Sequence, residues 1–229
     1  MFQFETGPDP LKVLLWCAGA FLLGSIPFGL ILVKLAGKGD VRAHGSGNIG
    51  ATNVSRVGGK GLGIVTLLLD AAKGFAPVAL ARAQGLPADL CAALALCAVA
   101  GHVFTPWLGF KGGKGVATAV GAALAYRWMA VLPSLFAFIL LLAVFRRVSL
   151  GSVIGAAILP VAMGWTHAVL DKRLGPFHLA VSDQDPWQAT LFWALVALLV
   201  IAKHHANLRR LMDGTEPPLW GDKKDGAHA

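Results

Sequence analysis

The sequence predicts an all-α integral membrane protein, and this prediction rests on its composition and on the length of its apolar runs. Of its 229 residues, 56% are hydrophobic and only 14% are charged, and the mean hydropathy is +0.66. A soluble domain carries about 25% charged residues, so this chain lacks the polar surface of one. The run from Leu11 to Leu35 has charges only at Lys12 and Lys34, and as a helix it can cross a hydrocarbon core of roughly 30 Å.

We expect the whole chain, residues 1–229, to form a single polytopic membrane domain with a tail from residue 204. The apolar segments lie at 11–35, 62–81, 90–107, 116–126, 128–145, 149–170 and 187–203. The fourth segment is short and could be fused with the fifth across Arg127. Pro133 and the aromatic residues Tyr126 and Trp128 favour a helix break at Arg127 instead.

The distribution of the 20 Lys and Arg residues decides between six and seven spans. With seven spans, most of these residues face one side of the membrane. The residues left in loops on the other side are Lys12, Arg82, Arg127, Lys172 and Arg173. With six spans, the basic tail and the basic first loop would face opposite sides. By the positive-inside rule we predict seven transmembrane helices, with the N-terminus outside and the C-terminus in the cytoplasm.

The formal net charge of +8 could indicate nucleic-acid binding, but basic residues in a membrane protein report topology, so we expect no nucleic-acid partner. The cysteines Cys17, Cys91 and Cys97 all lie inside apolar runs. Their spacing fits neither a metal site nor a disulfide framework, and we expect them to be small buried hydrophobic residues.

A glycine-rich loop over residues 42–63 predicts an anion-binding site. Successive glycines let backbone N–H groups converge on an anion, and Arg56 adds a planar guanidinium group suited to phosphate. The alternative is a flexible connector whose basic residues only mark the inner face. The candidate ligands in this loop are Gly45, Ser46, Gly47, Asn48, Gly50, Thr52, Asn53 and Arg56.

A second glycine-rich loop, residues 110–115, precedes an apolar segment. Its spacing is not that of a Walker P-loop, yet glycines and a lysine at a helix start offer N–H groups, a helix dipole and an ammonium group to an anion. The alternative is again a topology marker. The candidate ligands are Gly112, Gly113, Lys114 and Gly115.

Two further polar pairs stand at or within the apolar segments. If the last helix continues past residue 203, His204 and Asn207 lie on one face of it, which a basic anchor for anionic lipid heads does not explain. Asp70 and Lys73 lie three apart within the second span. Charges there are often functional, but we expect these two to neutralise each other as a structural pair.

Five motifs, in this order, resemble the bacterial acyl-phosphate:glycerol-3-phosphate acyltransferases of the PlsY type. They are GSIPFG (24–29), GSGNIGATNVSR (45–56), LDAAKG (69–74), GHVFTPWLGFKGGKGVAT (101–118) and KHHANLRRLMDGTE (203–216). The resemblance covers nearly the whole chain and implies a seven-helix membrane enzyme. The sequence departs from the commoner family tail at His205 and Ala206, where Arg and Glu are expected, which puts any role of neighbouring charges in doubt.

The resemblance implies that a fatty acyl group passes from acyl phosphate to the 1-hydroxyl of sn-glycerol 3-phosphate, giving lysophosphatidic acid and phosphate in phospholipid biosynthesis. It implies catalytic roles for Ser46, Arg56, Lys114, His204 and Asn207. It implies no cofactor or metal. The expected partners are the two substrates, membrane lipids and an enzyme that produces acyl phosphate. The expected location is the bacterial cytoplasmic (inner) membrane, with the active site facing the cytoplasm.

Two anion-binding loops on one face suit a reaction in which both substrates carry phosphate. Phosphate is a good leaving group, so we expect positioning and charge stabilisation, with a substrate phosphate oxygen accepting the hydroxyl proton. The alternative is His204 as general base. The competing classes are a transporter for a phosphorylated solute, which predicts polar residues through the full bilayer depth, and a purely structural membrane protein.

Overall fold

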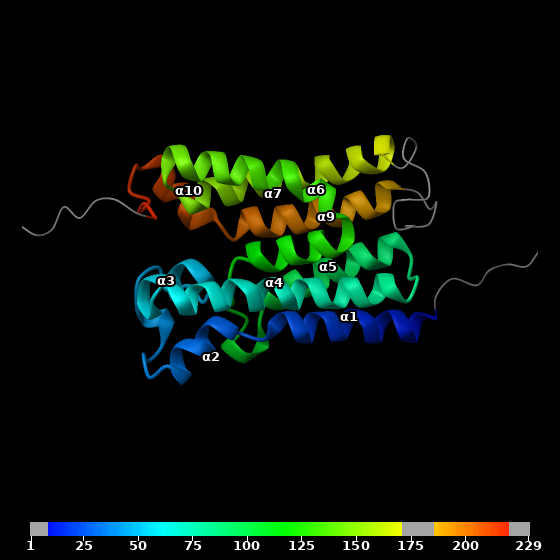
Figure 1. Cartoon of the computed structure of the whole chain (residues 1–229). Coiled ribbons are helices and arrows are strands. Elements are labelled where there is room, and N and C mark those ends of the chain that lie inside the picture. Colours follow the sequence, from blue (N-terminus) through cyan, green and yellow to red (C-terminus); the bar gives the residue numbers. More distant parts are fainter. Residues whose placement is uncertain (1–8, 171–185, 220–229) are drawn as a thin grey trace, which may run out of the picture.

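The computed structural model describes residues 9–170 and 186–219, and all regular structure within them is helical. The predictions made for Lys172, Arg173 and the end of the tail lie outside the described residues. Figure 1 shows the long helices side by side and aligned along one direction, as a bundle. The all-α architecture is therefore confirmed.

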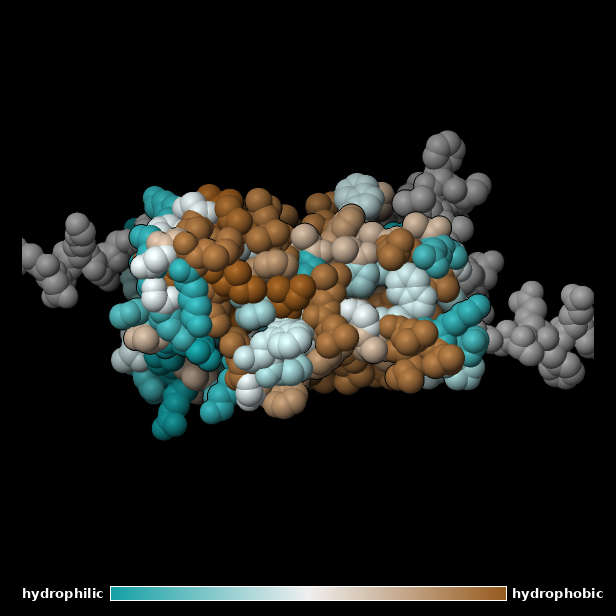
Figure 2. Space-filling view, turned by 90° about the horizontal axis from the view of Figure 1, so that it is seen from below, coloured by the Kyte–Doolittle hydropathy of each residue, from teal (hydrophilic) through white to brown (hydrophobic). Residues whose placement is uncertain are grey.

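Several helices are long and apolar enough to cross a membrane. Within residues 9–170 and 186–219, five stretches meet this criterion, and the bent pair at Trp187–Ala202 and His205–Met212 is a sixth if it is counted as one span. The five are Pro10–Leu35, Lys60–Ala83, Ala88–Leu108, Val116–Phe145 and Val148–Val169. Figure 2 shows an apolar band around the middle of one face, with polar residues gathered most densely at one end. The chain is a multi-pass membrane protein.

The first apolar segment is two helices, not the single helix that its length suggested. Helix α1 (Pro10–Ser25) ends before Pro27, and α2 (Phe28–Leu35) leaves in another direction (Figure 1). Proline lacks an N–H and its ring clashes with the preceding turn, so the helix breaks there. The freed carbonyl of Ser25 accepts the Thr105 hydroxyl at 2.6 Å, and that of Ile26 accepts the Lys73 ammonium at 2.7 Å.

Helices α3 (Ala51–Gly58), α4 (Lys60–Ala83) and α5 (Ala88–Val103) follow in the chain. Helix α5 is packed closely against α1 through glycines of both helices. A Cβ at Gly24 would overlap the carbonyl of Ala98, and one at Gly101 would overlap the carbonyl of Phe21. Small residues let membrane helices approach this closely, so their backbones pack in direct contact.

Helix α6 (Val116–Phe145) contains the break expected near Arg127. The backbone of Arg127 leaves the helical region (φ −158°, ψ 88°) and divides α6 into two arms. Arg82 of α4 donates to the freed carbonyls of Ala125 and Tyr126 at 2.6 and 2.7 Å. These hydrogen bonds satisfy the last turn of the first arm, whose carbonyls have no partner within the helix. The prediction of a break between Tyr126 and Trp128 is confirmed.

The second arm of α6 folds back toward the end of the molecule where the first arm starts (Figure 1). It packs along α7 (Val148–Trp165), where Gly151 lies against Phe138 and Gly155 against Ser134. A single π-helical turn, Thr166–Leu170, follows α7. This folding back brings the start of α7 toward the end of the bundle that carries α3 (Figure 1).

Helix α9 (Pro186–Ala202) crosses the bundle last and is followed by the short α10 (His205–Met212). Trp193 of α9 is fully buried, and its ring centroid lies 5.3 Å from that of Tyr126 at the end of the first arm of α6. This contact anchors α9 in the centre of the bundle. The cysteines Cys17, Cys91 and Cys97 are free, and only Cys91 is fully buried.

Candidate active site

The first polar loop folds around one buried amide. Asn53 of α3 is only 2% exposed, and its side-chain nitrogen donates to the carbonyls of Val41, His44 and Asn48 at 3.0, 3.1 and 2.9 Å. Its side-chain oxygen accepts the backbone N–H of Ser46 at 2.8 Å. Because the amide nitrogen and oxygen of Asn53 are both hydrogen-bonded to the loop backbone, Asn53 contributes to an anion site by holding the loop in shape.

Two glycines of this loop are required by backbone geometry. Gly45 and Gly47 have φ values of +61° and +69°, in the left-handed region that favours glycine. A Cβ at Gly45 would also overlap the side-chain oxygen of Asn53. The loop can therefore close on Asn53 only with glycine at position 45.

The remaining candidates of the first loop surround the start and end of α3. Gly50 caps the helix, and its N–H donates to the Asn48 side chain at 2.9 Å, while Thr52 lies half-buried in the first turn. Ser46 is exposed on the loop, and Arg56 is exposed in the last turn of α3. The hydroxyl of Ser46 and the guanidinium of Arg56 are thus accessible to a ligand.

The second glycine-rich loop folds back onto the end of α5. The N–H groups of Gly112 and Gly113 donate to the carbonyls of Val103 and His102 at 3.0 and 3.1 Å. Gly115 then takes a left-handed conformation (φ +81°) and caps α6. This path places Lys114 directly before the N-terminus of α6, where a helix dipole favours an anion.

Lys114 lies in a cationic environment. Burial lowers the pKa of Lys114 to about 8; the carboxylate of Glu216 opposes this shift, and the positive charges of Arg210 and Arg56 add to it. These three side chains are therefore each within electrostatic reach of Lys114. A half-buried ammonium group is stabilised by a bound phosphate.

The last helix is broken at His204, so the condition under which we placed His204 and Asn207 on one helix face is not met. Helices α9 and α10 meet at an angle of 56°, and His204 lies at this bend, 2% exposed. Its Nδ1 lies 2.8 Å from the Val200 carbonyl, which only accepts, so Nδ1 carries the hydrogen. The Nε2 atom is left with a lone pair that can accept a proton or a hydrogen bond.

Asn207 and Glu216 form a buried hydrogen-bonded group beside His204. The Glu216 carboxylate accepts from the Ser149 hydroxyl, the Asn207 amide and the Arg210 guanidinium, each at 2.7 Å. Burial raises the pKa of Glu216, but these three hydrogen bonds outweigh it and hold the pKa below its ordinary value. The ionised carboxylate ties α10 to the start of α7. Glu216 ends the fifth sequence motif but was given no role, and Ser149, 67 residues away, was not selected.

The polar residues singled out from the sequence meet at one end of the bundle. Figure 1 shows α3 and α10 at the same end. The Lys203 ammonium lies 5.4 Å from the ring centroid of Phe104, which joins the bend before α10 to the end of α5. Arg56 acts electrostatically on Lys114, and Glu216 joins Lys114 to the group around Asn207. Arg56, Glu216 and His204 are thus all within electrostatic reach of Lys114.

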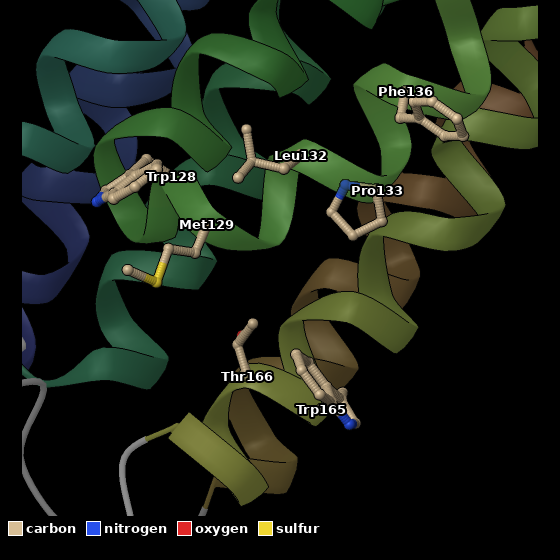
Figure 3. Close-up of a pocket in the computed structure, with 7 residues that line it drawn as sticks. All are labelled: Trp128, Met129, Leu132, Pro133, Phe136, Trp165 and Thr166. Atoms are coloured by element: carbon tan, nitrogen blue, oxygen red, sulfur yellow. The ribbon is translucent and has the colours of Figure 1, made fainter. Parts of the chain in front are cut away.

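A separate apolar groove of about 510 Å³ lies between α6 and α7. Figure 3 shows the residues of the second arm of α6 on one side and those at the end of α7 on the other. The lining residues are Trp128, Met129, Leu132, Pro133, Phe136, Trp165 and Thr166. None of the candidate catalytic groups lies in this groove, and its apolar walls are unsuited to phosphate.

Comparison with known proteins identifies relatives across the whole chain. The model of the glycerol-3-phosphate acyltransferase family matches residues 14–214. A glycerol-3-phosphate acyltransferase of Trichlorobacter lovleyi is 48% identical over 203 residues, which cover 89% of this chain and 95% of that protein. One from Sinorhizobium medicae is 43% identical over 224 residues, covering 97% and 98%.

Two solved structures share the fold. The crystal structure of PlsY (YgiH), an integral membrane glycerol 3-phosphate acyltransferase, in its glycerol 3-phosphate form aligns with a TM-score of 0.79 and 33% identity. That alignment covers 92% of this chain and 96% of the other. The lysophosphatidic acid form aligns with a TM-score of 0.74 and 32% identity, covering 90% and 95%.

Proposed function

Because this chain belongs to the glycerol-3-phosphate acyltransferase family and is an acyltransferase of the PlsY type, we propose that its acyl donor is acyl phosphate. The fatty acyl group passes to the 1-hydroxyl of sn-glycerol 3-phosphate, which gives lysophosphatidic acid and inorganic phosphate. The observation that carries this proposal is that Arg56, His204 and Glu216, the hydrogen-bond partner of Asn207, all lie within electrostatic reach of Lys114. A site with several cationic donors suits two phosphate-bearing substrates.

In the proposed reaction, the hydroxyl oxygen of glycerol 3-phosphate attacks the acyl carbonyl carbon. The new ester C–O bond forms, the bond between the carbonyl carbon and the bridging phosphate oxygen breaks, and phosphate leaves with the electron pair. Lys114 and Arg56 bind substrate phosphate and stabilise the negative charge that develops on it, while Ser46 and Asn207 contribute neutral donors. A substrate phosphate oxygen accepts the hydroxyl proton.

The alternative route takes the proton to His204. The Nε2 lone pair left by the Nδ1 contact with Val200 favours this alternative. The two routes differ in what His204→Gln does, because glutamine can position a substrate but cannot accept a proton at neutral pH. We expect His204→Gln to retain a substantial part of kcat relative to His204→Ala. Equal loss in both variants would favour the general-base route.

We further propose seven membrane crossings, with the N-terminus outside and the C-terminus in the cytoplasm of a bacterial cell. The two arms of α6, which reverse direction at Arg127, support counting α6 as two crossings. The site would then face the cytoplasm, where an enzyme that makes acyl phosphate can supply the donor. A reporter fused after Arg56 or at the C-terminus should read cytoplasmic, and one at Arg82 external. A cytoplasmic signal at Arg82 would overturn this topology.

The decisive experiment for the proposed function measures phosphate release by purified protein in detergent. With acyl phosphate, we expect release only when glycerol 3-phosphate is present, together with formation of lysophosphatidic acid. Acyl-CoA should give no product. Turnover with acyl-CoA would show that the donor is misassigned. Uptake of glycerol 3-phosphate into vesicles without acyl transfer would favour a transporter.

A further inference from the structure

A buried cluster of charged and titratable side chains lies outside the residues assigned to the site. Asp70 and Lys73 of α4 and His102 of α5 are only 2%, 2% and 4% exposed. The Lys73 ammonium pairs with Asp70 Oδ1 at 2.8 Å, so the pair expected from the sequence is formed. His102 Nδ1 faces the same oxygen at 3.7 Å, which is too long for a hydrogen bond. Such groups are costly inside a membrane domain and call for a specific use.

One side of this cluster supports the glycine-rich loop that carries Lys114. The His102 carbonyl accepts the N–H of Gly113, and the neighbouring Val103 carbonyl accepts that of Gly112. A Cβ at Gly113 would overlap Nε2 of the His102 ring. The loop therefore lies directly on the imidazole, and glycine at position 113 is what permits this contact.

The other side of the cluster holds the break between α1 and α2. The Lys73 ammonium donates to the Ile26 carbonyl at 2.7 Å and lies 5.6 Å from the ring centroid of Phe28. The same break is tied to the loop after α5, because Ser25 accepts hydrogen bonds from Thr105 and Trp107 at 2.6 and 2.8 Å. The cluster thus connects α4, α5, the helix break and the second loop.

We infer that His102 is a positioning residue for Lys114, with the buried Asp70–Lys73 pair lying beside its ring. The imidazole limits how closely Gly113 can approach α5, and this also fixes the position of Lys114, the next residue in the chain. The contact itself does not depend on the proposed function. The inference rests on that function only because its effect is measured as acyltransferase activity, for which Lys114 binds substrate phosphate. Displacement of such a group by about 1 Å can lower turnover roughly a hundredfold.

A double-mutant cycle tests this contact. Gly113→Ala forces the loop off the ring and should lower kcat/KM by roughly a hundredfold. His102→Ala removes the ring, so adding Gly113→Ala to that background should lower kcat/KM by less than about tenfold. The matched control is Gly112→Ala, whose Cβ meets the backbone carbonyl of His102. Truncating the His102 side chain cannot relieve that collision, so the penalty of Gly112→Ala should be the same in both backgrounds.

The KM values separate positioning from folding. His102→Ala should raise the KM for at least one phosphate-bearing substrate in protein that remains monodisperse. A merely structural role would reduce the yield and the thermal stability but leave the KM of the folded enzyme unchanged. Equal penalties of Gly113→Ala in both backgrounds, or an unchanged KM in His102→Ala, would overturn the inference. A wild-type protein without acyltransferase activity would instead overturn the proposed function, and thermal stabilities of the four proteins would still test the contact.

Discussion

The alkaline limb of the pH–rate profile should belong to Lys114. Burial lowers the pKa of this lysine to about 8, whereas an unperturbed lysine titrates above pH 10. The ammonium form is the one that binds phosphate. Activity that depends on it is therefore nearly complete at pH 7, half lost near pH 8 and lost as the pH rises further.

The size of the effect follows from this pKa. At pH 7 about nine-tenths of the free enzyme carries the ammonium, and at pH 9 about one-tenth does, so kcat/KM should fall roughly tenfold per pH unit above 8. A bound phosphate favours the charged lysine, so the limb in kcat should lie at higher pH than the limb in kcat/KM. Lys114→Arg places a group there that stays protonated throughout this range. Its activity is expected to be lower, but its alkaline limb should disappear.

The assay is phosphate release from acyl phosphate between pH 6 and 10, corrected for hydrolysis without enzyme at each pH. The matched control is Lys111→Arg, because Lys111 is exposed in the same loop and is assigned no contact with substrate. This variant should keep the wild-type profile. If Lys114→Arg retains the limb near pH 8, or if the wild-type profile stays flat to pH 9.5, the assignment of Lys114 to substrate phosphate is wrong.

Two other substitutions test the buried contacts that shape the site. Glu216→Gln removes the negative charge that accepts hydrogen bonds from three donors, so it should lower the free energy of unfolding by about 1.5–3 kcal/mol, measured as a lower thermal midpoint. The control is Asp213→Asn, at an exposed position. Equal thermal midpoints of the two variants would contradict the role of Glu216. Gly45→Ala should lower kcat/KM at least tenfold, because the added Cβ collides with Asn53. The control is Gly37→Ala, because Gly37 has a similar φ of +70° but open space around it. This control should keep its kcat/KM and lose only about 1 kcal/mol of stability through backbone strain. Similar activity of the two alanine variants would show that the Asn53 contact does not control the loop.

Much of the fold was predictable because membrane helices leave strong local signals. The break at Arg127 was visible as a charged residue between two aromatic residues, followed by Pro133. The break at Pro27 was missed because no charged residue interrupts the apolar run there. What stabilises it, Lys73 and Thr105, lies far along the chain. A local sequence pattern cannot show that a distant side chain will hydrogen-bond the carbonyl groups that a helix break leaves free.

The site was predictable to the extent that it depends on residue type within a loop. Arg56 and Lys114 were selected for their chemistry, and the structure places them within electrostatic reach of each other. Asn53 was selected as a ligand, but its amide is used to shape the loop, which only the three-dimensional path of residues 41–48 reveals. Glu216 was part of the fifth motif but was given no role, because its partner Ser149 belongs to another helix and no spacing rule joins them.

The most direct test of the central claim, that the first loop holds substrate phosphate, compares Arg56→Ala with Arg42→Ala. Arg42 lies in the same loop but is paired with Asp40 at 2.6 Å, and no role in binding is assigned to it. Loss of a charge-assisted contact of about 1.5–3 kcal/mol should raise the KM of one phosphate-bearing substrate, or lower kcat/KM, roughly ten- to a hundredfold in Arg56→Ala. Arg42→Ala should remain close to wild type. If both variants keep wild-type kinetics for acyl phosphate and for glycerol 3-phosphate, the first loop does not bind phosphate.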